Sequence, residues 1–345
     1  MDITAQIQDI VNGWQFITAD RFINAALALL LTMIVGFVTG TRGDTAVPLY
    51  WRFIDVTFGV LGARLDKKNR KEGDLILRGF IVVVFMLLFT GALGVYAESY
   101  IPFLPQSRLI EVLLLSFCMS SGAVWINILH IYRLSQDKKA ASQGQYLILA
   151  RTSRIDLSTR DKYTITRTGA EVLVRMFDKA AVTPALWYAL GGLPAVFIYS
   201  ALAAYSWKNS YDGNGKGTGL IGQALEKLMG FVMSVFSASL LAMTTILVPA
   251  SGPFSGLKPL MKAGRGSPYE QGGQPLSVLA YALKITLGGA VKHVNGRSMK
   301  RDWTGPKGAT AKLDPGHLKR ILYMVILAHI FLLSALIGAS VYASL

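Results

Sequence analysis

The distribution of lysine and arginine between apolar stretches is the feature that most restricts how this chain can fold. Six stretches of about 20 residues are apolar enough to cross a lipid bilayer as helices. They cover residues 22–40, 76–96, 109–132, 184–207, 229–250 and 321–343. Because an open strand would leave backbone groups unpaired in lipid, these stretches predict an all-α integral membrane protein.

The cations are concentrated in alternate connections between the apolar stretches. Three connections are rich in lysine and arginine: the first, which ends at Arg78, holds eight, the second, with Lys179 as its last cation, holds ten, and the third, which ends at Arg320, holds twelve. The other connections hold the remaining five of the 35 lysines and arginines. Cytoplasmic loops of membrane proteins are enriched in these residues, so we expect both termini to be periplasmic, in a bacterial inner (plasma) membrane. The chain is then one polytopic domain over 1–345, with predicted cytoplasmic loops 41–75, 133–183 and 251–320.

The strong positive charge indicates which partners suit this chain. With a net charge of +15, its cytoplasmic side would attract the anionic lipids of the inner leaflet, and a phosphate-bearing substrate would be drawn to the same surface. Nucleic acid is not expected, because the basic loops lack interleaved aromatic side chains. The lipid bilayer is therefore the predicted partner, while a homo-oligomer or a second membrane protein is left open.

The sequence shows no metal-binding or phosphate-loop pattern. A single cysteine, Cys118, excludes a disulfide within the chain. The four histidines are scattered, without the spacing that places two of them on one helix face. The glycine-rich segment 212–219 lacks the spacing of a phosphate loop, because Gly217 separates Lys216 from Thr218. Any metal ligand is therefore left unknown.

Three segments in and beside the loops carry local expectations. Residues 164–182 have apolar positions near helical spacing, which predicts an amphipathic helix leading into the fourth apolar stretch. That stretch contains Gly191, Gly192 and Pro194, which predicts a break inside it. Residues 276–291 are too short and polar to span, so we expect a helix lying on the cytoplasmic face or dipping into it.

Three segments, in this order along the chain, resemble the adenosylcobinamide-phosphate synthase family, called CobD/CbiB. GDTAVP at 43–48 is similar to the Gly-Asp-Pro and following proline after the family's first span. TPALWYALGGLP at 183–194 is similar to an Ala-Pro-Leu-Phe-Trp run with Gly-Gly-Leu-Pro. RGSPYEQGGQPLSVLAYALKITLGG at 265–289 resembles the third family segment and keeps its Ser267, Pro268, Gly273 and Pro275.

The resemblance implies a fold, an activity and site residues. Members of the family are membrane proteins of cobalamin (vitamin B12) biosynthesis that join aminopropanol or its phosphate to cobyric acid through an amide bond. This chain would then have the CobD/CbiB fold and be a ligase that uses ATP and Mg²⁺ on a corrinoid substrate. The implied catalytic residues are Asp44 and Glu171. The implied substrate-binding residues are Arg151, Lys262, Arg265, Ser267, Pro268 and Gly273.

Several positions that are acidic in the family pattern carry other residues here. Arg175 stands at a glutamate position, and Ser206 in AAYSWK stands at an acidic position. Glu226 and Lys227 stand at a pair of aspartates. Because Mg²⁺ is held by carboxylates together with phosphate oxygens, replacing acids with arginine, serine and lysine removes ligands. Two functions therefore stay open, a ligase and a catalytically inactive CobD/CbiB-like membrane scaffold or signalling subunit.

The predicted topology leaves a question about residues 208–228. Strict alternation places them outside, whereas the resemblance expects them to meet a cytoplasmic substrate. Either the stretch 184–207 is re-entrant and 229–250 is also irregular, or the six-span count is right and 208–228 has no nucleotide to meet. A transporter is a third function, disfavoured because no charged residue lies near the middle of a predicted span.

Overall fold

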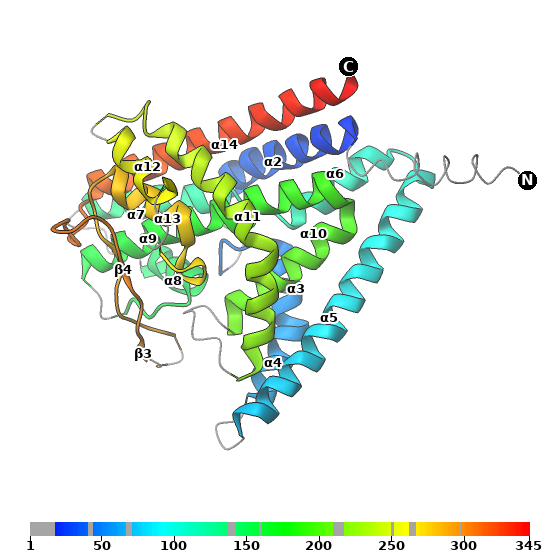
Figure 1. Cartoon of the computed structure of the whole chain (residues 1–345), viewed down its shortest axis with the longest axis horizontal. Helices are drawn as coiled ribbons and strands as arrows, with labels where there is room; N and C mark the ends of the chain where they lie inside the picture. Colours follow the sequence, from blue (N-terminus) through cyan, green and yellow to red (C-terminus); the bar gives the residue numbers. More distant parts are fainter. Residues whose placement is uncertain are drawn as a thin grey trace, which may run out of the picture.

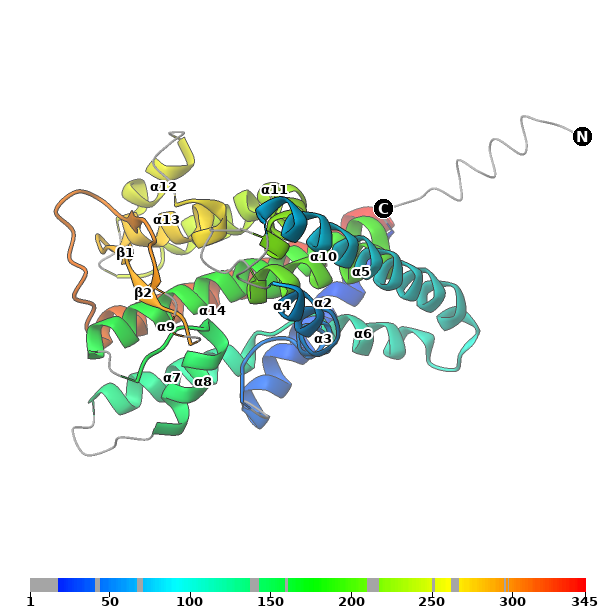
Figure 2. The ribbon, with the colours of Figure 1, turned by 90° about the horizontal axis from the view of Figure 1, so that it is seen from below.

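The computed structural model shows a bundle of long helices with a lobe of short helices and strands at one end (Figures 1 and 2). It describes residues 18–40, 44–66, 71–136, 143–158, 161–209, 217–249, 252–261, 267–294, 296 and 298–345. The helices of the first half are α2 (Ala19–Thr39), α3 (Leu49–Ile54), α4 (Val60–Leu65), α5 (Glu72–Tyr100), α6 (Ser107–Phe117), α7 (Gly122–Gln136) and α8 (Gln143–Ser153). Those of the second half are α9 (Lys162–Phe177), α10 (Thr183–Asn209), α11 (Leu220–Thr244), α12 (Pro253–Met261), α13 (Gly273–Ala282) and α14 (Pro315–Ser344).

Shorter elements connect these helices. Two π-helical turns join α3 to α4 and α9 to α10, namely η1 (Asp55–Gly59) and η3 (Asp178–Val182). The 3-10 turns are η2 (Ile101–Phe103), η4 (Gly217–Gly219) and η5 (Tyr269–Gln271). In the lobe, two antiparallel pairs of two-residue strands form, β1 (Leu287–Gly288) with β4 (Trp303–Thr304) and β2 (Val291–Lys292) with β3 (Ser298–Met299).

The predicted all-α membrane protein is confirmed. In the described part of the chain, five helical stretches are long and apolar enough to cross a membrane: Ala19–Thr39, Glu72–Phe103, Lys162–Asn209, Gly217–Thr244 and Pro315–Ser344. A sixth is the pair α6 and α7, which passes the same test together but is bent by 42°. The stretch predicted as one span over 109–132 is therefore two helices that meet at an angle.

The long helical stretch from α9 through α10 turns sharply at Gly191 and Gly192. Gly192 has φ of +65° and ψ of −157°, a conformation that residues with a side chain rarely adopt. A Cβ at this position would also overlap the carboxylate of Glu98. Pro194, two residues after Gly192, has no N–H for the helical hydrogen bond. The predicted break in the fourth apolar stretch is confirmed.

Beyond this break, α10 runs back along α5. The backbones of Gly94 and Pro194 approach so closely that a Cβ on Gly94 would overlap Pro194. At its other end, α10 carries Lys208, whose Nζ lies 2.6 Å from Oδ1 of Asp55 in η1. In Figure 1 this half of α10 descends beside α5 toward α3 and α4. The chain therefore turns round at the break and returns.

The contacts of Thr218 show that it lies on the same side of the bundle as Lys208. The Thr218 hydroxyl donates to the Gly62 carbonyl at 3.4 Å, and Thr218 also packs against Gly79 near the start of α5. Both partners belong to the first cation-rich connection or to the helix that follows it directly. Of the two alternatives for 184–207, these contacts favour the re-entrant one.

The helix expected over 164–182 forms, but it is buried on all sides rather than amphipathic. Every residue from Thr166 to Phe177 is buried, because α7, α8, α13 and α14 pack around α9. The helix begins at a cap in which the Thr164 N–H donates to Oδ1 of Asp161 at 2.7 Å. Arg167, Glu171 and Arg175 of α9 therefore lie in the protein interior.

The helix expected over 276–291 is correct only in its first part. It ends at Ala282, and Lys284 then adopts φ of +53°, which turns the chain into β1 and β2. Most of α13 is buried, against α11 and α12.

The start of α2 and the end of α14 lie side by side (Figures 1 and 2). The Ser340 hydroxyl donates to the Ala19 carbonyl at 2.9 Å. This agrees with an even number of membrane crossings between them. The side on which they lie stays a prediction from the positive-inside rule.

Candidate functional site

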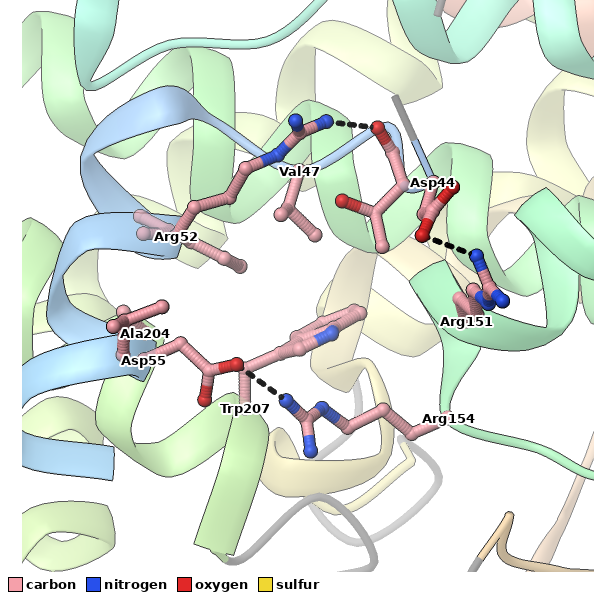
Figure 3. A pocket seen from close by; sticks show the side chains of 11 residues that line it. Asp44, Val47, Arg52, Asp55, Arg151, Arg154, Ala204 and Trp207 are labelled. Carbon is pink, nitrogen blue, oxygen red and sulfur yellow. Dashed lines mark hydrogen bonds and ion pairs between the residues drawn. The ribbon is translucent and has the colours of Figure 1, made fainter. Parts of the chain in front are cut away.

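An open pocket lined by arginine and aspartate lies where the loop before α3, η1, α8 and α10 meet (Figure 3). Its cavity has a volume of about 520 Å³. Guanidinium groups bind carboxylate and phosphate in a bidentate way, so such a pocket suits an anionic ligand. We call it the arginine pocket and define it by Asp44, Arg52, Asp55, Arg151 and Arg154, with Trp207 as its inner wall.

Each aspartate of the arginine pocket is paired with a cation. Asp44 forms an ion pair with Arg151 at the exposed mouth of the pocket. Deeper inside, Nη2 of Arg154 lies 3.2 Å from Oδ2 of Asp55 (Figure 3). Lys208 holds the other oxygen of the same carboxylate. Ion pairs this exposed to solvent contribute little to stability. An anionic ligand can therefore compete for these arginines without a large loss of folding free energy.

Local backbone features place these side chains. The Arg52 guanidinium donates to the Thr45 carbonyl, which fixes the loop before α3. Asp55 is the first residue of a π-helical turn, a feature that is frequent at functional sites. Arg154 follows α8 with φ of +56°, which is costly for a residue with a side chain. Strained residues of this kind cluster at ligand sites.

A second cavity of about 870 Å³ opens beside the arginine pocket. It shares Asp44, Arg151 and Arg154 with that pocket, and its lining is otherwise largely apolar. We call it the apolar extension; its apolar walls come from Tyr146, Leu147, Ala150, Leu157 and Val294. A ligand that fills both cavities would meet charged groups at one end and apolar side chains at the other.

Behind Trp207 lies a cluster of buried charged side chains. Nζ of Lys179 is 2.6 Å from Oε1 of Glu226, and these side chains are only 6% and 2% exposed. The Tyr269 hydroxyl donates to the same oxygen at 2.6 Å. The Arg175 guanidinium lies 4.6 Å from the ring of Trp207. We call Arg175, Lys179, Glu226 and Tyr269 the inner cluster.

The inner cluster leaves little free space. The cavity beside it has a volume of about 10 Å³, roughly enough for one water molecule. Burial raises the pKa of Tyr269 well above 10.0, and the charge of Glu226 raises it further. The phenol therefore stays protonated at physiological pH and keeps donating to Glu226.

Trp207 separates the arginine pocket from the inner cluster. Its indole lines both cavities, packing 5.6 Å from the ring of Trp51 and covering Arg175. The indole N–H donates to the Thr152 carbonyl at 2.9 Å, which holds the ring in place. A single side chain thus lies between the open pocket and the buried charges.

The inner cluster brings together positions at which this chain departs from the family pattern. Arg175 of α9, Ser206 of α10 and Glu226 of α11 all line the same small cavity. Sequence reasoning identified these three departures but not that they meet. It missed Lys179, although this lysine follows Arg175 by four residues and so lies on the same helix face.

Two of the residues implied by the resemblance meet in the arginine pocket, Asp44 and Arg151. Glu171 lies elsewhere, buried against the lobe, where Nη1 of Arg301 is 2.7 Å from its Oε2. The Gly288 N–H also donates to Glu171 at 2.8 Å. These contacts give Glu171 a role in holding α9 to the lobe, while its catalytic role stays a prediction.

Three of the remaining implied residues, Ser267, Pro268 and Gly273, belong to the lobe. Ser267 and Pro268 line a third cavity of about 950 Å³, which also carries Lys258, Lys284 and Lys307. Gly273 begins α13 nearby. Lys262 and Arg265 lie outside the residues that the structure describes.

Sequence reasoning missed most of the arginine pocket. Arg52, Asp55 and Arg154 were not singled out, nor was the wall residue Trp207. A signal existed for Arg154, because it lies in the same RTSRID segment as Arg151. The others carry no motif, and only the packing of α3 against α10 brings them to the site.

The two charged sites differ in how they suit Mg²⁺. Within the described ranges, no three histidine, cysteine, aspartate or glutamate side chains are grouped to hold a metal. Mg²⁺ bound with a nucleotide needs only one or two carboxylates beside the phosphates, which Asp44 and Asp55 could supply in the arginine pocket. The inner cluster does not fit the ion, because Glu226 is already held by an ammonium and a phenol.

Comparisons with known proteins agree with this picture. A family model described as CobD/Cbib protein matches residues 26–325. The cobalamin biosynthesis protein CobD of Sinorhizobium sp is 24% identical over 179 residues, 51% of this chain and 54% of the relative. That of Clostridium perfringens is 22% identical over 280 residues, 76% of this chain and 83% of the relative. The chain thus aligns with about half the length of the first relative. No solved structure matches. On the extent of the family match, the chain belongs to the CobD/CbiB family.

Proposed function

We propose that this chain takes part in cobalamin biosynthesis by joining aminopropanol, or its phosphate, to cobyric acid through an amide bond. The observation that carries the proposal is the convergence of three guanidinium groups and two carboxylates on one open cavity. Membership of the CobD/CbiB family and two relatives named cobalamin biosynthesis protein CobD support the pathway.

The arginines would bind the phosphates that this reaction uses. Arg52, Arg151 and Arg154 come from different turns of the chain, so each can contact a different oxygen. ATP supplies the free energy for amide formation when it is bound. As phosphate oxygens take over the arginines, Asp44 loses its partner and Asp55 loses one of its two, so that an oxygen of each becomes available to hold Mg²⁺ with the phosphates.

The apolar extension would take the bulk of the corrinoid. Its apolar walls suit a large ring system, and it shares Arg151 and Arg154 with the arginine pocket. A carboxylate of the corrinoid bound at this junction would therefore lie next to the phosphates. Holding two reactants in this way converts a bimolecular step into an effectively unimolecular one.

A second candidate function is a catalytically inactive membrane scaffold or signalling subunit. The inner cluster favours it, because Arg175 and Ser206 stand at positions that the family pattern makes acidic, and Lys179 neutralises Glu226. If the reaction depends on carboxylates at these positions, the chain would keep the fold without the chemistry.

An activity assay with variants separates the two functions. Purified protein is given cobyric acid, aminopropanol phosphate and Mg-ATP, and amide product is measured. A ligase makes product, and Arg151→Ala should lower kcat/KM by about 10- to 100-fold, the loss of one charge-assisted contact. Arg78→Ala is the matched control, since this arginine pairs with Asp74 on α5. No product from a folded parent protein supports the scaffold.

A further inference from the structure

The inner cluster is a charged site whose cations come from the chain itself. Lys179 approaches Glu226 at 2.6 Å and lies 4.4 Å from the centre of the Tyr269 ring. Both side chains are buried, so water contributes little to either group. A buried charge is tolerated only when a partner is held this closely.

The charges of this region balance without any added ion. Arg175 and Lys179 supply two positive charges, and Glu226 and Asp178 supply two negative ones, all of them buried. The Ser237 hydroxyl donates to Oδ1 of Asp178 at 2.6 Å. A divalent cation would leave two uncompensated positive charges in a region of low dielectric constant.

The geometry also leaves a metal ion without a place to bind. Oε1 of Glu226 already accepts from both Lys179 and Tyr269. Mg²⁺ prefers near-octahedral oxygen ligands, and the adjoining cavity of about 10 Å³ has room for roughly one water molecule. The family resemblance implies Mg²⁺, and the donor set of the inner cluster disagrees with it.

We infer that the Lys179 ammonium occupies the place of a divalent cation in the inner cluster, so that this site is neutralised by the protein itself and binds no metal. The inference concerns the inner cluster alone and does not depend on amide synthesis. Any metal dependence of this protein then arises where phosphates bind, at the arginine pocket.

Mn²⁺ binding without nucleotide tests the inference in the parent protein. The amount of bound Mn²⁺, read by electron paramagnetic resonance, should be the same for the parent and for Glu226→Gln. Bound Mn²⁺ that disappears with Glu226→Gln would overturn the inference. Because no substrate is present, the result stands whether or not the protein is a ligase.

Charge substitutions test the role of Lys179 directly. Lys179→Met leaves Glu226 without its cation and should lower the thermal unfolding temperature, and adding Glu226→Gln should restore most of the loss. Lys227→Met is the matched control; this neighbouring lysine is 49% exposed, pairs with Glu270 and should have little effect. An unchanged unfolding temperature for Lys179→Met would overturn the inference.

A designed site provides the converse test. The double variant Arg175→Gln, Lys179→Asp removes both cations and adds a carboxylate next to Asp178 and opposite Glu226. Once folded, it should bind one Mn²⁺ ion and be stabilised by it, and further substitution of Glu226 by Gln should abolish the effect. A folded double variant without Mn²⁺ binding would contradict the inference. If it does not fold, the two preceding measurements still decide.

Discussion

The ammonium of Lys208 lies 2.6 Å from the carboxylate of Asp55, which ties the last turn of α10 to η1. Arg154, shortly before α9, pairs with the other oxygen of the same carboxylate. Both ends of the hairpin formed by α9 and α10 therefore meet at one residue. The arginine pocket is built at this meeting point, from segments that are far apart in the sequence.

The hairpin predicts which residues are exposed on the same side of the membrane. In a background with Cys118→Ala, we expect Asn209→Cys and Ser158→Cys to react with an impermeant maleimide from the same side. Ser344→Cys, at the end of α14, should react from the opposite side. Labelling of Asn209→Cys and Ser344→Cys from the same side would show that residues 193–209 do not return to the side of Ser158.

Trp207 is expected to act as a wall between the arginine pocket and the inner cluster. Ser206 lines the small cavity beside the inner cluster and is only 6% exposed. A cysteine placed there by Ser206→Cys should therefore react slowly with a water-soluble maleimide. Adding Trp207→Ala should raise its rate several-fold, whereas Trp207→Phe keeps an aromatic wall and should change it less. Equal reaction rates in all three proteins would show that the Trp207 indole does not restrict access to the cavity beside the inner cluster.

Gly230 is expected to tolerate no side chain, because a Cβ there would overlap the Tyr269 hydroxyl. Gly230→Ala should reduce the free energy of unfolding by about 1–3 kcal/mol, the usual effect of overpacking. Adding Tyr269→Phe should recover part of this loss. Gly338→Ala is the control, since a Cβ at that position meets no atom within 4 Å. Thermal unfolding in detergent measures all of these variants.

The start of α14 should depend on pH through Asp314. Burial alone would raise the pKa of this carboxyl, but hydrogen bonds and charge from His317 outweigh it and lower the pKa below 3.8. Stability from this cap is therefore fully present above pH 3.8 and is lost as the pH falls through the lowered value. At neutral pH, Asp314→Ala should reduce the free energy of unfolding by about 1 kcal/mol. The parent and the variant should converge in acid, and a constant difference would contradict this role.

The membrane architecture follows from local sequence patterns. Each apolar stretch is contiguous, and the break at Gly192 depends on residues next to it in the chain, so both could be predicted. The burial of α9 could not, because four other helices surround it and its own sequence carries Glu171 and Arg175. The sequence also left open on which side of the bundle Lys208 lies, because this depends on its contact with Asp55, which is far away in the chain.

The candidate site was predicted only where a motif marked it. Asp44 lies in a segment that resembles the family, Arg151 was implied by the same resemblance, and both line the arginine pocket. Lys179 and Glu226 are 47 residues apart, and their pairing depends on how α11 packs against η3. No local pattern reports such a contact.

The most direct test of the account is whether the purified chain transfers isotope-labelled aminopropanol phosphate to cobyric acid. We expect a corrinoid product whose mass carries the label, formed only with Mg-ATP and strongly reduced by Arg154→Ala. No labelled product from a folded protein that still binds its substrates would contradict the proposed ligase activity.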